Sequence, residues 1–398
     1  MNPSTNWKKR LDKWLAPFLG VLGDKRRRKW APLYILGLLL PGDRKSMQPI
    51  RSRVAPHDEE QIHHFVATSC WDTAPVEKVL CNKVDQMLGG DESYLIVDDT
   101  ALPKKGTESV GVAHQYCGAL GKQANCQSLV SLTLARDDMP APVGLRLYLP
   151  QSWTDDRARC ERVGVPANIV YRPKWRIALD EIDRVRASGV RFGIVLADAG
   201  YGPCAEFRQG LSQRGLHWAV GIISTQNIYT EHVQISVPPP AKRGPPPVRP
   251  IASEAPCSAE CFIDKHATFR RVTWRQGTKG PLTGEFAIVR ARPADSDEVK
   301  DGVHLPGDPA WLVCERLSNG DRKFYLANLP ASASAKKVVA AIKARWSCEQ
   351  MHQQAKEELG LDHFEGRSWT GLHHHVVLTM IAFAFLLHIR LTENKSPA

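Results

Sequence analysis

Two apolar segments of this chain end in aspartate, and a later polar segment carries a glutamate. Residues 94–98 lead to Asp99, and residues 192–197 lead to Asp198. Each segment has the length and composition of a buried strand. Side chains at the ends of strands reach the edge of a sheet, where ligands can approach. Glu349 follows on a segment with helical spacing. These three carboxylates are therefore candidates for one acidic site.

Three converging carboxylates repel one another unless cations lie between them. Hard oxygen ligands favour Mg²⁺, for which Mn²⁺ can substitute. Two such ions about 3.5–4 Å apart would activate a water or a 3′-hydroxyl and stabilise the leaving oxygen of a phosphodiester. The pattern thus predicts a two-metal site for phosphoryl transfer. The competing interpretation is an accidental set of acidic residues in an ordinary α/β protein.

The segment around Glu349 has a specific order of charged residues. Arg345, Glu349 and Lys356 follow the spacing Arg-x3-Glu-x6-Lys. This order resembles the Tyr-x2-Arg-x3-Glu-x6-Lys signature of bacterial insertion-sequence transposases of the DDE superfamily, with Ile342 in place of the tyrosine. It is similar to the insertion sequence 701 group, which is close to the insertion sequence 4 group. Further similarity lies in residues 42–50, 98–100, 103–106, 197–202 and 358–369.

The same segment has a physical interpretation. On one helix, Arg345 and Glu349 would lie one turn apart, and Lys356 would follow on the same face. The carboxylate would hold metal and the two cations would hold phosphates. A solvated helix with an i,i+4 salt bridge is the alternative. Strand alternation sends Asp98 and Asp99 to opposite sides and leaves the choice between them open. In the resembling family the catalytic aspartate precedes a threonine, which implies Asp99.

The chain has 398 residues and a formal net charge of +11. Residues 1–56 hold thirteen Lys and Arg against three Asp, so nearly all of the surplus lies there. A basic segment of this kind favours contact with phosphates, whereas a solvated helix face is the alternative. Lys105, next to the first acidic pair, is a further candidate for DNA contact. The densest basic run consists of Lys25, Arg26, Arg27, Arg28 and Lys29.

The acidic residues must be positioned by an α/β core. Strands are expected at 94–99, 128–135, 143–149, 192–198 and 217–222, and helices at 175–188 and 204–214. Their order is typical of a ribonuclease-H-like fold. Further strands at 286–291, 311–315 and 323–327 predict a β-rich insertion, entered through prolines at 238–240 and 245–247. The expected division is a helical basic region 1–88, a first core part 89–222, the insertion 223–334, and the core completion with a C-terminal helix 335–398.

The two ends of the chain are expected to be helical. Pro32, Pro41 and Pro49 predict short helices near the start. The apolar run Val376–Leu387 has twelve residues, too few to cross a bilayer, so it predicts a buried helix within 373–391 and no membrane partner. Ten cysteines at irregular spacings indicate reduced thiols. The expected location is therefore the bacterial cytoplasm, at the nucleoid.

Other residues are weaker candidates. His373, His374 and His375 cannot all face one ion from a helix, so buried or DNA-facing roles are expected. Trp311 and Trp369 are either core residues or platforms for a flipped base. Tyr201, beside the second aspartate, is a candidate for substrate contact.

The resemblance implies cut-and-paste transposition. Such a protein binds the terminal inverted repeats of its element, cleaves there, and joins the exposed 3′-ends to target DNA. Two ends must be brought together, which implies a homodimer on double-stranded DNA. Two alternatives remain: a domesticated transposase-derived protein that binds DNA without cutting it, and a ribonuclease-H-like host nuclease.

Overall fold

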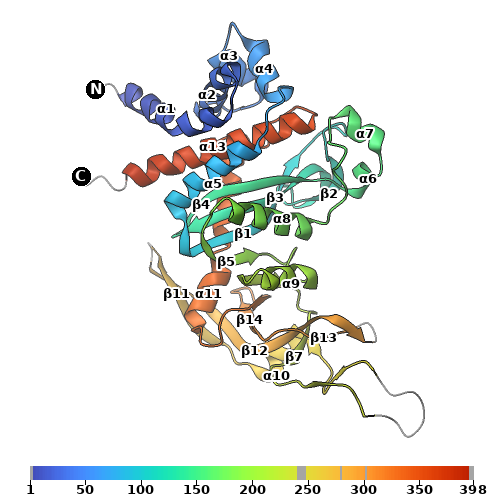
Figure 1. Ribbon diagram of the computed structural model, residues 1–398. Coiled ribbons are helices and arrows are strands. Elements are labelled where there is room, and N and C mark those ends of the chain that lie inside the picture. Colours follow the sequence, from blue (N-terminus) through green and yellow to red (C-terminus); the bar gives the residue numbers. More distant parts are fainter. Residues whose placement is uncertain (1–2, 240–247, 278–279, 301–302, 394–398) are drawn as a thin grey trace. The chain divides into compact units, whose positions relative to one another are not determined.

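The chain folds as a mixed α/β protein with helices at both ends (Figure 1). The computed structural model describes residues 3–239, 248–277, 280–300 and 303–393. Two compact units are formed, one by residues 1–192 with 346–398, and the other by residues 193–345. Prolines at 238–240 and 245–247 were expected to lead into the β-rich insertion, and residues 240–247 of this segment lie outside the described residues.

The first unit contains an antiparallel sheet built around one long strand. β3 (Lys122–Arg136) pairs with β1 (Gly90–Pro103) on one side and β4 (Met139–Tyr148) on the other. Asp137 and Asp138 have positive φ, as the tight turn between β3 and β4 requires. The three expected strands are therefore present. However, β1 continues past Asp99 to Pro103, so the expectation that Asp99 ends its strand is wrong. The short edge strand β2 (Ala113–Cys117) also pairs with β3 and has no apolar alternation that would have revealed it.

Helices surround this sheet. The C-terminal helix α13 (Trp369–Glu393) packs against β4 and against α2, α4 and α5 (Figure 1). The expected break at Pro32 is wrong, because α2 runs through it and its buried face packs in the core. The remaining helices of the unit are α1 (Pro3–Val21), α2 (Lys25–Leu39), α3 (Met47–Val54), α4 (Glu59–Ala67), α5 (Ala74–Leu88), α6 (Gln151–Thr154), α7 (Arg157–Arg162), α8 (Lys174–Ala187) and α12 (Trp346–Glu357).

The helix α13 is longer than its apolar run suggested. It has 25 residues and, by length and composition alone, could cross a membrane, with a mean hydropathy of 1.7 in its most apolar window. However, 67% of that window is buried inside the protein. Its near-uniform apolar surface is matched by neighbours on several sides, as expected for a core helix. The expectation of burial is thus confirmed. The conclusion that the segment is too short to cross a bilayer is wrong, because it counted only the twelve residues Val376–Leu387 of a 25-residue helix.

The second unit continues with a mixed sheet. β5 (Phe192–Ala197) runs parallel to β6 (His217–Ile222), and β6 pairs with β15 (Arg322–Ala327). The order continues through β14 (Ala310–Arg316) to β12 (Gly280–Lys300), so the strands expected after residue 223 are found. The other elements are β7 (Asn227–Thr230), β8 (Ile235–Ser236), β9 (Ile251–Ala252), β10 (Cys257–Ser258), β11 (Arg270–Gly277), β13 (Val303–Pro306), α9 (Ala205–Gln213), α10 (Ala259–His266) and α11 (Ala335–Lys343).

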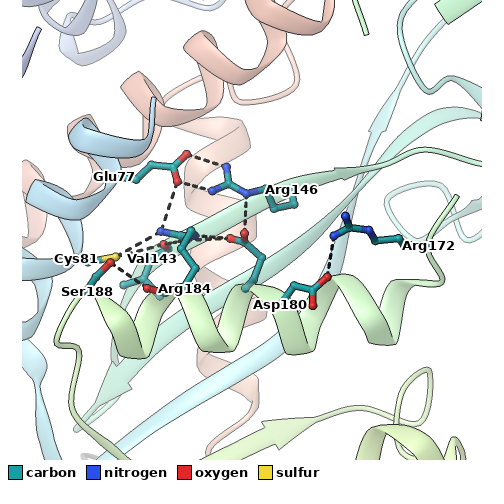
Figure 2. A network of polar contacts seen from close by, with 9 residues as sticks. Glu77, Cys81, Val143, Arg146, Arg172, Asp180, Arg184 and Ser188 are labelled. Carbon is teal, nitrogen blue, oxygen red and sulfur yellow. Dashed lines mark hydrogen bonds and ion pairs between the residues drawn. The ribbon is translucent and has the colours of Figure 1, made fainter. Parts of the chain in front are cut away.

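A buried ion network joins α5, β4 and α8 in the first unit (Figure 2). Arg146 on β4 donates to both carboxylate oxygens of Glu77 and, at 2.7 Å, to Glu181 on α8. Arg184 donates to Glu181 at 2.9 Å. Burial alone would raise the pKa of Glu77, but the two guanidiniums lower it below its usual range. The network therefore holds α8 against the sheet through charges that satisfy one another.

We predict that Glu77→Gln lowers the free energy of unfolding by about 3 kcal/mol, because it leaves buried guanidinium groups short of one charge. The exposed pair of Arg172 and Asp180, visible in the same view, is a matched control (Figure 2). Arg172→Ala should cost less than about 1 kcal/mol. Chemical denaturation measures both. Equal effects of the two substitutions would contradict a stabilising role for the network.

Candidate active site

The aspartate pair within β1 is divided between two environments. Asp98 is buried, and its carboxylate accepts a hydrogen bond from the thiol of Cys348 at 3.0 Å and from the backbone N–H of Asp99 at 2.8 Å. The Asp99 side chain is 32% exposed, and its Oδ2 lies 2.5 Å from Nζ of Lys174. Asp99 is therefore the member of the pair that a ligand from solvent can reach.

The helix α12, which carries Glu349, packs against the strand that bears this pair. Its buried face packs against β1 and β3, with Cys348 on the carboxylate of Asp98. One turn later, His352 Nε2 lies 2.8 Å from Ser131 Oγ, which in turn donates to the Asp98 carbonyl oxygen. Glu349 directly follows Cys348 and is exposed. Side chains from β1, β3 and α12 thus fix the helix that carries Glu349 against the strand that carries the aspartate pair.

The three charged residues of the Arg–Glu–Lys segment do not share one helix. Arg345 lies in the turn between α11 and α12, so the expected helical stripe is wrong at this position. The same break leaves Trp346 43% exposed. Lys356 lies in the last turn of α12, where burial lowers its pKa while the Asp362 carboxylate opposes that shift. Periodicity could not reveal the break, because the segment contains no Gly or Pro.

Asp198 follows β5 in the second unit and begins a tight turn. Its Oδ1 accepts from the N–H of Gly200 at 2.8 Å, and its carbonyl oxygen accepts from Tyr201 and Gly202. A Cβ atom at Gly202 would lie 1.7 Å from the carbonyl oxygen of Gly221 on β6, so only glycine fits there. Glycine at position 202 is therefore a steric requirement of the turn that carries Asp198.

The ligand chemistry of the first unit fits a cation. The Asp99 carboxylate already holds an ammonium group, and Glu349 is exposed on the helix packed beside it. Oxygen ligands of this kind suit a hard divalent ion. In the described part of the chain, no three His, Cys, Asp or Glu side chains form a group that could hold a metal ion. Convergence of all three carboxylates stays a prediction, because Asp198 belongs to the other unit.

Comparison with known families identifies the chain. Residues 17–281, more than half of its length, match the family model described as DDE superfamily endonuclease. The chain belongs to the DDE superfamily of endonucleases. The matched range includes Asp99 and Asp198 and ends before Glu349. Endonucleases of this superfamily generally depend on divalent metal ions, in agreement with the carboxylate chemistry of the aspartate pair.

Two known proteins resemble the chain. A probable transposase for insertion sequence element IS701 from Microchaete diplosiphon is 28% identical over 230 residues. The aligned region covers 58% of this chain and 57% of that protein, so the match spans little more than half of the relative. A structure described as a piggyBac transposase synaptic complex with hairpin DNA is 10% identical with a TM-score of 0.46, covering 94% of this chain and 68% of that one.

The basic run of this DDE-superfamily chain lies at the start of α2. Lys25 and Arg28 are exposed, whereas Arg27 donates to the Cys70 carbonyl oxygen at 2.8 Å. Arg26 and Lys29 are exposed and pair with Asp24 and Asp58 respectively. Lys105 is exposed in the loop after β1. Four cations of the run are therefore accessible, and Arg27 has a structural role.

The three consecutive histidines lie on α13 with different partners. The His375 ring accepts from the Tyr34 hydroxyl at 2.9 Å and donates to the Leu361 carbonyl oxygen at 3.2 Å. His374 lies between the carbonyl oxygens of Val66 and Trp71. Desolvation by burial lowers the pKa of all three histidines, including His373, to about 4. They are therefore neutral packing residues, which agrees with the buried role, one of the two roles expected from the sequence.

The aromatic candidates are engaged in packing. Tyr201 is 3% exposed and its ring centroid lies 5.4 Å from that of Phe207. The Trp369 ring lies 4.2 Å from that of His373. Trp311 donates its ring N–H to the Pro330 carbonyl oxygen at 3.1 Å. The burial of Tyr201 contradicts the expected contact with substrate, and the two tryptophans have protein neighbours on their rings.

Sequence reasoning missed a buried cation behind the Asp198 turn. Arg208 on α9 is 1% exposed and donates to the carbonyl oxygen of Gly202 and, at 2.9 Å, to Asp295 on β12. Desolvation raises the pKa of Asp295, although the Arg208 guanidinium opposes that shift. The pair connects the inserted strands to the turn that carries Asp198. No signal marks it, since the two residues are 87 positions apart.

We predict that Arg208→Met lowers the free energy of unfolding by about 3–5 kcal/mol, because it leaves Asp295 buried without its counter-charge. The double variant with Asp295→Leu should be less destabilised than Arg208→Met alone. Thermal denaturation of the four proteins of this double-mutant cycle measures the coupling. Additive effects of the two substitutions would show that the pair does not act as a unit.

Proposed function

We propose that this chain is a DNA transposase that cleaves at the ends of its element and joins the freed 3′-ends to target DNA. One observation carries the proposal: the Cys348 thiol on the Asp98 carboxylate, which joins the helix that bears Glu349 to the strand that bears Asp99. Membership of the DDE superfamily and the similarity to an insertion-sequence transposase support it. The same chemistry at every step, in-line phosphoryl transfer, allows one site to perform the whole reaction.

In this proposal Asp99, Asp198 and Glu349 hold two Mg²⁺ ions, for which Mn²⁺ can substitute. When bound, the ions would activate the attacking hydroxyl and stabilise the leaving oxygen. Lys356, at the end of α12, holds a phosphate beside the scissile bond. Arg345 does the same from the turn before α12. The buried Asp98 anchors α12 to β1 and keeps Glu349 in place.

The partner is double-stranded DNA, as terminal inverted repeats and as target. A homodimer brings two ends together. The strands that carry Asp99 and Asp198 belong to a ribonuclease-H-like core in this proposal, interrupted by a β-rich insertion from residue 223 to 334. The sequence of strands and helices from β1 to β6 supports this core. Helices of residues 1–88 contribute end recognition through their exposed cations.

We predict that Glu349→Gln lowers the rate of Mg²⁺-dependent nicking about a thousandfold, because the amide lacks the charge that holds a divalent ion. The substrate is a duplex that carries the DNA flanking the gene. Affinity for that duplex, measured by gel shift, should be unchanged. Nicking by the wild type, lost in the variant with binding retained, would distinguish a transposase from a domesticated protein that never cuts. Joining of 3′-ends by the wild type would distinguish it from a host nuclease.

A matched control lies on the same helix. Glu357 is exposed near the end of α12 and makes hydrogen bonds to Gln353. Glu357→Gln removes the same charge and should leave nicking within about twofold of the wild-type rate, a surface change of under about 0.5 kcal/mol. If Glu357→Gln abolishes nicking while Glu349→Gln does not, the assignment of the third carboxylate is wrong.

The basic run offers a test of DNA binding. Deletion of residues 1–56 would remove core residues such as Leu15 and Ile35, so alanine substitutions are the cleaner change. We predict that Lys25→Ala with Arg28→Ala weakens DNA affinity and reduces the dependence of log affinity on log salt by up to about 0.9 for each lost phosphate contact. Lys336→Ala with Lys337→Ala removes equal charge from exposed positions on α11. The same salt slope for both double variants would argue against a specific contact.

A further inference from the structure

A lysine outside the expected set contacts the exposed aspartate of β1. Lys174 is the first residue of α8, and its Nζ lies 2.5 Å from Oδ2 of Asp99. The two side chains are 33% and 32% exposed. The ring of Tyr148 on β4 lies 5.2 Å from the same ammonium. Both residues belong to the first unit, so the contact is internal to one compact body.

The position of this lysine is unfavourable for the helix itself. A cation in the first turn of a helix opposes the helix dipole, which favours anions there. The first turn of α8 contains no acidic residue that would offset this charge. The local helix therefore gives no reason for a lysine at residue 174, and the contact with Asp99 does.

The ion network of Figure 2 fixes the helix that carries Lys174. Glu181 and Arg184, both on α8, are tied to β4 and α5 through Arg146 and Glu77. Because α8 cannot slide along the sheet without breaking these pairs, the lysine at its start is held at Asp99 on β1. The ammonium is thus placed by the fold rather than by a mobile loop.

The ammonium and a divalent ion would compete for the same carboxylate. Mg²⁺ binds carboxylate oxygens at about 2.0–2.1 Å, closer than the ammonium lies. Two cations on one oxygen repel each other, so binding of metal to Oδ2 requires the lysine to withdraw. Lysine can withdraw, because its charge is carried on a flexible four-carbon chain.

We propose that Lys174 is an internal counter-ion of Asp99 that competes with divalent metal and so lowers the metal affinity of this site. The inference rests on the proposed function, in which Asp99 is a metal ligand. In the metal-free protein Lys174 neutralises Asp99. When metal binds, the ammonium leaves the carboxylate and faces solvent at the edge of the site. Lys174 is therefore a positioning residue that tunes metal binding rather than a ligand.

The test is the affinity of the full chain for Mn²⁺ without DNA, from the electron paramagnetic resonance signal of free Mn²⁺. Lys174→Met should bind Mn²⁺ roughly three- to tenfold more tightly than the wild type, as expected when a partly exposed ion pair is removed. Lys174→Arg keeps the charge and should bind less tightly than Lys174→Met. If Lys174→Met does not fold, Lys174→Gln makes the same test with a polar side chain.

Two controls separate the outcomes. Arg176→Met removes one charge from the same turn of α8, where Arg176 pairs with Asp180 instead, and should leave Mn²⁺ affinity within about twofold. Asp99→Asn should weaken Mn²⁺ binding. If Asp99→Asn weakens binding but Lys174→Met matches the wild type, the counter-ion proposal is overturned and the proposed function stands. Equal tightening by Lys174→Met and Arg176→Met also overturns it, because only the net charge would matter. If Asp99→Asn binds as the wild type does, the metal assignment itself fails.

Discussion

The contact between Cys348 and Asp98 is the interaction on which the proposed site depends. It joins two segments 250 residues apart, and it does so at the residues that directly adjoin Glu349 and Asp99. A buried carboxylate needs hydrogen-bond donors, and here a thiol and a backbone N–H provide them. The chain from His352 through Ser131 to the Asp98 carbonyl oxygen adds a second connection between α12 and the sheet. Together they fix the separation between the helix and β1.

This arrangement gives two adjacent aspartates different tasks. Strand alternation sends Asp98 toward α12 and Asp99 toward α8. The inward carboxylate is satisfied within the protein and therefore anchors the helix. The outward carboxylate pairs with Lys174, a side chain that can withdraw. Two adjacent positions of one strand would thus combine a structural acid and an exchangeable acid without any change in the backbone.

Much of the fold could be predicted from the sequence, because β1 and β5 contain apolar runs that are typical of buried strands. The continuation of β1 past Asp99 to Pro103 was not predicted. The burial of α13 and the strands β12, β14 and β15 followed from the same kind of pattern. The break before Trp346 could not be predicted, since neither Gly nor Pro marks it. Lys174 and Arg208 could not be found either. Their roles come from contacts with residues 75 and 87 positions away, and spacing carries no information on such contacts.

The position of the basic segment has a consequence for how DNA would be held. The helices α1 and α2 are not a separate appendage, because they pack on α5 and α13 within the unit that carries Asp99 and Glu349. Their inward faces supply core residues, while Lys25 and Arg28 face solvent. A phosphate bound at the start of α2 would therefore be held at a fixed position relative to β1 and α12. A close-packed core transmits displacement from one side to the other. A shift of DNA bound by this segment would therefore also shift the scissile strand relative to Asp99.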